Sequence, residues 1–154
     1  MNQLTQLYEY IKQLAEADPL INTILKVDFN DIDLKKEIVF PLLNVRIITG
    51  GFTTGPTIRL NVQIGVFDIR DINKEIRTDI FWGQDNEVDN HNMGIGVLNR
   101  LWSKMLRDFE ENNITASENP TFELGFFERA KLLDGVIISF DVEVPNTTIS
   151  LCPQ

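Results

Sequence analysis

Apolar and polar residues alternate most clearly in the stretch from Glu37 to Asp71. From Thr57 to Val66 every second residue is apolar and the residues between are polar or glycine, which predicts a β-strand with one buried and one solvent-exposed face. Val39–Ile48 has a similar pattern and predicts a partner strand. The segment 50–56 between them contains three glycines and a proline, so we expect a long antiparallel hairpin whose loop is longer than a tight turn needs.

Two segments have the three-and-four spacing of apolar residues that is typical of an amphipathic helix. The first covers residues 2–17 and is ended by Pro19, because proline disfavours helical geometry in the residue before it. The second runs from about Asp89 to Glu111. Gly94 and Gly96 fall in its first turns, where each weakens a helix by roughly 1 kcal/mol relative to alanine, and they indicate close packing or a later start.

A second hairpin is predicted at the end of the chain. Its first strand is Thr121–Glu128, its turn lies within Arg129–Gly135, and alternation then runs from Val136 until Pro145. The apolar residues of the first strand share one face, which we expect to be buried. These residues are Phe122, Leu124 and Phe126.

The elements therefore follow the order α-β-β-α-β-β, with a brief strand at Leu25–Phe29 and a loop at Glu111–Pro120. Apolar faces of this kind are buried most simply when two helices pack on one face of an antiparallel sheet of two long hairpins. We predict an α+β fold, with residues 1–154 forming a single domain. The polar segment 69–92 is too long for a bare loop and is expected to form an extended arm, partly a strand at Arg77–Trp82. The tail 146–154 is expected to be extended.

Composition and charge narrow the function classes. A formal net charge of -9 and a sequence pI near 4.5 argue against a general nucleic-acid binder, which needs a basic face. The same charge is compatible with a surface that DNA passes without sticking. A single cysteine, Cys152, rules out an intramolecular disulfide. The first residues lack a signal-peptide pattern, and no apolar stretch approaches the roughly 20 residues of a membrane helix, so we expect a protein made and assembled in the cytoplasm without membrane contact.

Candidate catalytic chemistry is sparse. His91 is the only histidine, and its neighbours Asp85, Glu87 and Asp89 offer oxygen ligands for a hard cation. A zinc site needs more nitrogen or sulfur ligands, and the glycine of an EF-hand loop is missing, so a solvated acidic loop is the favoured interpretation. The pair Asp68 and Asp71 follows a strand but is accompanied by no histidine or phosphate-binding loop. We therefore predict no catalytic residue, no cofactor and no metal.

Large aromatic residues in polar surroundings suggest another kind of site. Phe81 and Trp82 either dock on their own sheet or anchor on another chain. Phe52, beside Thr53 and Thr54 at the hairpin tip, either contacts a partner or folds back with its loop. The arginines of the first hairpin line its polar side and form a solvated face or contact acidic groups of a neighbouring copy. These arginines are Arg46, Arg59 and Arg70.

Several segments, in this order, resemble the tail terminator (tail-completion) proteins of long-tailed bacteriophages. After a short leading helix come VFPLLNVRI (Val39–Ile47) and RLNVQIGVFD (Arg59–Asp68). A polar stretch and the helix GVLNRLWSKML (Gly96–Leu106) follow, and the chain closes with LLDGVIISFDVEVP (Leu132–Pro145) and a Cys-Pro pair. The resemblance spans nearly the whole chain. The long segment 69–92 departs from a minimal version of this family pattern.

The resemblance implies a structural virion protein without catalytic residues. Such proteins form a homo-oligomeric ring, commonly of six copies, at the head-proximal end of the tail. They stop polymerisation of the tail tube protein and provide the surface for the head-tail connector protein. Double-stranded DNA passes through the lumen without specific binding, which an acidic chain favours. The alternatives are another neck or tail-tube component or, in a different class, a small-molecule-binding or enzymatic α+β domain with a pocket between helix and sheet.

Overall fold

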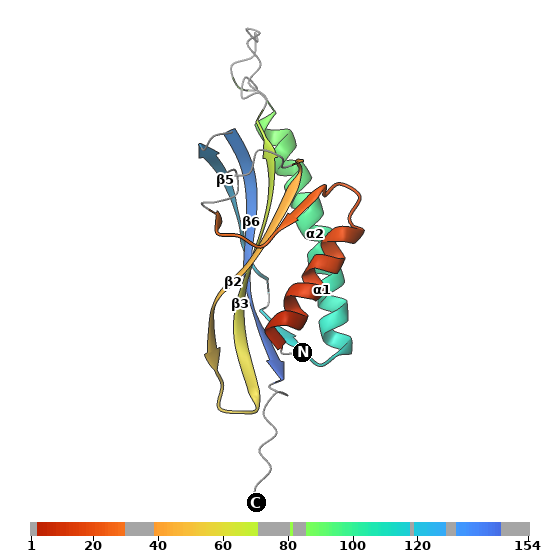
Figure 1. The fold of residues 1–154 in the computed structure, drawn as a ribbon, viewed down its shortest axis with the longest axis vertical. Coiled ribbons are helices and arrows are strands. Elements are labelled where there is room, and N and C mark those ends of the chain that lie inside the picture. Colours follow the sequence, from red (N-terminus) through yellow and green to blue (C-terminus); the bar gives the residue numbers. More distant parts are fainter. Residues whose placement is uncertain are drawn as a thin grey trace, which may run out of the picture.

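The structure is a computed structural model that describes residues 3–29, 39–70, 81, 86–117, 119–128 and 132–145. Within these ranges the chain forms two helices and six strands (Figure 1). The helices are α1 (Gln3–Ala17) and α2 (Glu87–Glu111). The strands are β1 (Thr23–Leu25), β2 (Leu42–Phe52), β3 (Thr57–Ile69), β4 (Thr115–Ala116), β5 (Phe122–Glu128) and β6 (Leu132–Pro145).

All six strands belong to one open sheet with the order β1-β2-β3-β6-β4, and β5 also pairs with β6. Every pairing is antiparallel except that of β1 with β2, which is parallel. β4 and β5 lie along the same outer edge of β6, at opposite ends of that strand. The predicted α+β class and its mostly antiparallel sheet are confirmed.

Both helices lie on one side of the sheet (Figure 1), as the sequence pattern predicts. The alternating apolar residues of β3 and β6 face them, and Val62 and Val142 are fully buried. Gly94 brings α2 close to the sheet, because a Cβ at this position would lie 2.7 Å from the Cγ2 of Val136. The close-packing interpretation is therefore correct for Gly94.

The other side of the sheet, here called the open face, carries a smaller apolar cluster centred on Phe67. The Phe67 ring covers Gly65 and Gly135, where an added Cβ would lie 2.5 Å and 2.6 Å from ring atoms. The side chain of Asn44 holds the segment after β1 against this cluster. Its amide donates to the carbonyl of Val27 at 2.9 Å, and its Oδ1 accepts from the Val27 N–H at 3.0 Å.

The helices cover only part of the β2–β3 hairpin. Its far end extends past the ends of both helices (Figure 1). β1 pairs only with residues 42–44 of β2, so the rest of β2 has no outer partner among the described residues. The pairing register of β2 against β3 shifts between Ile47 and Thr49. Beyond this shift Phe52 pairs with Ile58, which in turn pairs with Val144.

Three predicted boundaries are wrong. β1 lies at Thr23–Leu25 and not at Leu25–Phe29. β2 continues through the two glycines to Phe52, because both glycines pair with β3, and the loop is only residues 53–56. The expected loop after α2 contains the short strand β4. The end of β5 at Glu128 and the start of β6 at Leu132 agree with the prediction that the turn of the second hairpin lies within 129–135.

The predicted burial of the apolar face of β5 is also wrong. Among the described residues β5 pairs only with β6, and α2 packs mainly over β6, β3 and β4. Phe122, Leu124 and Phe126 are therefore 49%, 51% and 40% exposed. Phe127, on the opposite face, packs edge-on against Phe67 with a ring centroid distance of 5.6 Å.

Most of the arm predicted at 69–92, most of the strand predicted at 77–82, and the tail 146–154 fall outside the described residues. At its two ends the arm prediction is wrong, because residue 69 belongs to β3 and residues 87–92 belong to α2. Within the described part of the chain, no helix is long and apolar enough to cross a membrane.

Candidate functional site

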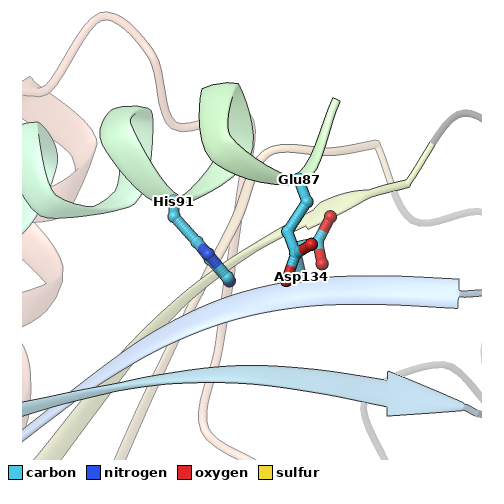
Figure 2. Close-up of side chains that lie close together, drawn as sticks. All are labelled: Glu87, His91 and Asp134. Carbon is cyan, nitrogen blue, oxygen red and sulfur yellow. The ribbon is translucent and has the colours of Figure 1, made fainter. Parts of the chain in front are cut away.

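One cluster of possible metal ligands is found among the described residues. Glu87 and His91 lie one turn apart on α2 and face β6, which carries Asp134 (Figure 2). One potential ligand atom from each residue lies within 4.8 Å of the others. Glu87 and His91 were predicted to be part of a solvated acidic loop, but they lie in the first turns of a helix. Asp134 could not be added from the sequence, because only the packing of α2 on β6 brings it close.

Arg70 already neutralises the carboxylates of this cluster. Its Nη2 lies 2.6 Å from Oδ1 of Asp134 and 3.3 Å from Oε1 of Glu87. The Asp134 side chain is fully buried, and that of Arg70 is only 13% exposed. Asn90 donates a further hydrogen bond to Oδ2 of Asp134 at 3.0 Å. The buried charge is therefore paired and hydrogen-bonded, as a charge in a protein interior must be.

A metal ion does not fit this arrangement well. Carboxylate and imidazole are suitable ligands for divalent metals, but a cation would have to displace the guanidinium from both carboxylates. The guanidinium also lies 3.9 Å from the centroid of the Phe126 ring, and Nε2 of His91 lies 3.2 Å from the carbonyl oxygen of Gly125. We interpret the cluster as a structural one that ties the start of α2 to β3, β5 and β6.

A cavity of about 300 Å³ lies between α1, the last turns of α2 and the end of β6. Its wall is mostly apolar, with polar groups from Gln6, Tyr10, Asp108 and Asn112. The remaining lining residues are Leu7, Phe109, Ile114, Val144 and Pro145.

Tyr10 and Asp108 form a hydrogen bond at this cavity, with the hydroxyl donating to Oδ2 at 2.6 Å. Burial and this hydrogen bond raise the pKa of Tyr10 well above its usual range. The same hydrogen bond, with help from Lys104, lowers the pKa of Asp108 despite its partial desolvation. Neither group is thus tuned toward neutral pH, where a general acid or base works best. They are the two ionisable side chains among the lining residues.

The hairpin differs in charge from the rest of the chain. Between Leu42 and Phe67 lie two of the 14 basic residues and none of the 23 acidic residues. At its end Phe52 is 93% exposed, the highest value among the exposed large apolar residues that the structure describes. The turn is held by Thr53, whose Oγ1 lies 2.6 Å from Oγ1 of Thr57 and accepts from the Gly55 N–H at 3.3 Å.

No family model and no curated protein matches this chain. A functional assignment therefore rests on the geometry and chemistry of these surfaces.

The predicted contact residues are only partly brought together. Phe52 is exposed, which excludes the alternative in which its loop folds back over it. Thr53 and Thr54 lie in the loop beside it. Arg46 and Arg59 lie on the open face, in pairs with Gln63 and Glu143, and the buried Nε of Arg46 has no hydrogen-bond partner among the described residues.

The prediction that Arg70 lines the same polar face is wrong. Positions 59 and 70 differ by an odd number, so a regular strand places them on opposite faces, and Arg70 turns toward Asp134 on the helix side. Phe81 is 78% exposed, in agreement with an aromatic residue outside the core. Trp82 lies outside the described residues.

Sequence reasoning missed the acidic C-terminal end of α2. This end carries Asp108, Glu110 and Glu111, and its last turn contains no basic residue. The C-terminus of a helix has a partial negative charge, which disfavours acidic side chains and favours cations. The missing basic residues could have been recognised from the sequence once the helix end was assigned.

Proposed function

We propose that the protein is a structural virion subunit, a phage tail terminator that forms a ring at the head-proximal end of the tail. The observation that carries the proposal is the projecting β2–β3 hairpin, which is basic in an acidic chain and ends in the exposed ring of Phe52. Packing in the core of the subunit does not explain an aromatic side chain that is exposed in this way. Large aromatic residues that serve as anchors in a partner's surface have this placement.

The open sheet offers two different edges for association. The distal part of β2 lacks an outer partner among the described residues, and β5 forms the other edge with β6 as its sole partner strand there. Unpaired edge strands readily bind further strands, and proteins usually protect them. Identical subunits that join through two different surfaces form a heterologous interface, which closes into a ring when the rotation allows.

The charge of the chain agrees with a ring around DNA. An overall formal charge of -9 repels phosphate, so DNA can move through a lumen of such subunits without being held. The ring would contact the tail tube protein on one side and the head-tail connector protein on the other.

The experiment is the analysis of tails made with and without this protein. We expect a ring, with six copies as the commonest number in such assemblies, at the end of normal tails, and tubes of uncontrolled length when the protein is missing. A monomer that is found in no tail preparation would contradict the proposal. Retention on a DNA column that falls with salt would contradict the passive role toward DNA.

A second candidate is a small-molecule-binding domain, which the cavity of about 300 Å³ favours. Screening the purified full chain by thermal shift against a metabolite library tests this candidate. A saturable ligand whose stabilising effect is lost in Tyr10→Phe would favour binding over the structural role.

A further inference from the structure

We infer that the outer part of β2, Gly50–Phe52, pairs with β5 of a second copy of this chain, as two antiparallel strands of one continuous sheet. This contact deepens the proposed ring function and rests on it for its setting. It gives each open edge of the sheet a partner strand. The two edges differ in sequence, so the contact can repeat from one subunit to the next.

The backbone groups that point outward at the two edges follow from the hydrogen bonds of β6. On the β3 side, the N–H of Arg70 donates to the carbonyl of Leu132 at 2.9 Å. On the other side, the N–H of Ser117 donates to the carbonyl of Asp141 at 2.9 Å. Because these directions alternate along an antiparallel strand, even-numbered residues of β6 point to β3 and odd-numbered residues point to β5. The register then leaves outward groups at even-numbered positions of both edges, which are Phe122, Leu124, Phe126, Gly50 and Phe52.

The outer end of β2 is open, whereas the part before the register shift is not. There the N–H of Ile47 donates to the hydroxyl of Tyr8 at 2.8 Å, so α1 protects this stretch of the edge. Within the described parts of the chain, the outward groups of Gly50 and Phe52 have no such partner. The edge that can accept a further strand is therefore the end that extends past both helices (Figure 1).

One register matches the two strands on the helix side of the sheet. When Phe122 of the neighbour lies opposite Phe52, both residues present outward groups, as a hydrogen-bonded antiparallel pair requires. Both side chains lie on the helix side, as do those of their ladder neighbours Ile58 and Ile138. The two phenylalanines are 93% and 49% exposed, so pairing them removes a large apolar surface from water.

The same register brings opposite charges together on the open face. Glu123 belongs to this face, because its ladder partner Ile137 packs in the cluster around Phe67. In the neighbour it would lie opposite Gly51, whose own ladder partner is Arg59. There is open space where a Cβ of Gly51 would be, so the two long side chains can meet across it. Both are exposed, and among the described residues neither has an ion-pair partner.

Charge favours this pairing of unlike edges over a pairing of like edges. β5 contains two acidic residues and no basic one, whereas the hairpin from Leu42 to Phe67 contains two arginines and no acidic residue. Two β5 strands paired with each other would bring four carboxylates together without a cation, and two hairpins would bring their arginines together. The charges are complementary only when β2 pairs with β5.

The register also sets the offset between neighbouring subunits. Phe52 lies level with Val144 of its own β6 and would lie level with Ile138 of the neighbour's β6, which is an offset of six residues. At the usual spacings this is about 20 Å along the strands for about 19 Å across four strands, so strands of a closed sheet would be inclined by about 45° to its axis. Closed sheets have inclinations near this value, so the contact is compatible with a ring.

The first test exchanges the charges of the proposed pair in the full chain. Arg59→Glu places two carboxylates at every contact, and Glu123→Arg places two guanidinium groups there. In an equimolar mixture, alternating subunits restore a pair of opposite charges at each contact. Self-association is measured by sedimentation velocity at low salt, and folding by circular dichroism. Glu9→Arg, at an exposed position on α1, is the matched control.

We expect each charge variant alone to weaken self-association about fivefold per contact, and the mixture to return to within about twofold of the wild type. Glu9→Arg should associate like the wild type. A mixture that associates no better than its two components would overturn the proposed register.

The second test concerns the backbone of β5. Leu124→Pro removes an outward N–H that the pairing with β6 does not use, and proline is tolerated at such edge positions. Leu124→Ala shortens the same side chain but keeps the N–H. We expect Leu124→Pro to weaken self-association at least about tenfold and Leu124→Ala to have a clearly smaller effect. If Leu124→Pro does not fold, the charge variants decide.

The outcomes separate this inference from the proposed function. Wild-type rings that are unaffected by the charge variants and by Leu124→Pro would overturn the pairing and leave the ring to other surfaces. Two-fold dimers that are broken by Leu124→Pro but not by Arg59→Glu would show that β5 pairs with itself, which also overturns the inference. Open filaments that respond to the charge exchange as expected would support the pairing and contradict the closed ring. A chain that stays monomeric at millimolar concentration would overturn the pairing, and tail preparations would still decide the function.

Discussion

The guanidinium of Arg70 lies 2.6 Å from the carboxylate of Asp134, a residue 64 positions later in the chain. The contact joins the end of β3 to the start of β6, and Asn90 adds α2 to it. Because the Asp134 side chain has no exposed surface, its charge depends on these partners.

Removing Arg70 should therefore destabilise the fold. We expect Arg70→Met to lower the free energy of unfolding by about 3 to 5 kcal/mol, because it leaves a buried carboxylate without its counter-charge. Urea unfolding at neutral pH measures this change. Arg59→Met, at an exposed position, is the control and should stay within about 0.5 kcal/mol of the wild type. Equal effects of the two substitutions would show that the buried pair has no special role.

Val62 tests the assignment of faces along β3. It is fully buried against the helices, so Val62→Asp should abolish folding at 25 °C, because no partner is available for a charge at that point. Its neighbour Gln63 faces the open side, and Gln63→Glu should fold. Far-ultraviolet circular dichroism and NMR amide dispersion distinguish the outcomes. A folded Val62→Asp protein would mean that the strand register is incorrect.

The glycine pair under Phe67 should be required for packing on the open face. Gly65→Ala adds a Cβ 2.5 Å from the ring of Phe67, so we expect a loss of about 1 to 3 kcal/mol from overpacking. In a Phe67→Leu background the same substitution should cost clearly less, because the smaller side chain leaves room. A double-mutant cycle measured by thermal or urea unfolding tests this coupling. Additive effects would rule out the proposed clash.

Tyr10 should make stability fall at alkaline pH. Burial and the hydrogen bond to Asp108 raise the pKa of Tyr10 in the folded protein, whereas the unfolded chain titrates at a pH of about 10. The contribution of Tyr10 is complete below that pH and is lost as the pH rises above it, because the unfolded chain loses the proton first. Urea unfolding from pH 8 to pH 11.5 should show this decline in the wild type and a flatter profile in Tyr10→Phe. Identical profiles would contradict the raised pKa.

Arg59 should affect assembly more than folding. It is exposed on the open face of the projecting hairpin and has no ion-pair partner among the described residues. Arg59→Glu should lower the yield of rings much more than it lowers the thermal transition, where the new charge opposite Glu143 of the same chain has a small effect. An undiminished ring yield in Arg59→Glu would remove Arg59 from the interface.

The sequence predicted the layers of this fold because local periodicity determines which face of each element is buried. Val62, Val97 and Val142 lie where alternation or helical spacing places them, and all are fully buried. The exposure of Phe122 could not be predicted, because it depends on how far α2 extends over the sheet edge. Alternation identifies an apolar face, but it does not show whether another element covers that face.

The candidate sites depended on long-range contacts to different degrees. Phe52 was identified because an aromatic residue between glycines and threonines is unusual, and that signal is local. The cavity and the Arg70–Asp134 pair join segments that are distant in sequence, such as Leu7 with Val144, and no local pattern encodes them. The acidic end of α2 was missed, although it depends on no long-range contact: helical spacing alone shows where the helix ends.

The register shift between Ile47 and Thr49 divides the hairpin into an inner and an outer part. On the inner side of Ile48 the pairing is fixed by buried residues such as Val45, whereas on the outer side no residue of β2 is buried. One extra residue is already accommodated at this point, so removal of Ile48 would restore regular pairing. The outer hairpin can therefore change in length and tip sequence during evolution while the core stays the same. In the ring proposed above, changes confined to this outer part would alter the fit between neighbouring subunits while the fold of each subunit stays the same.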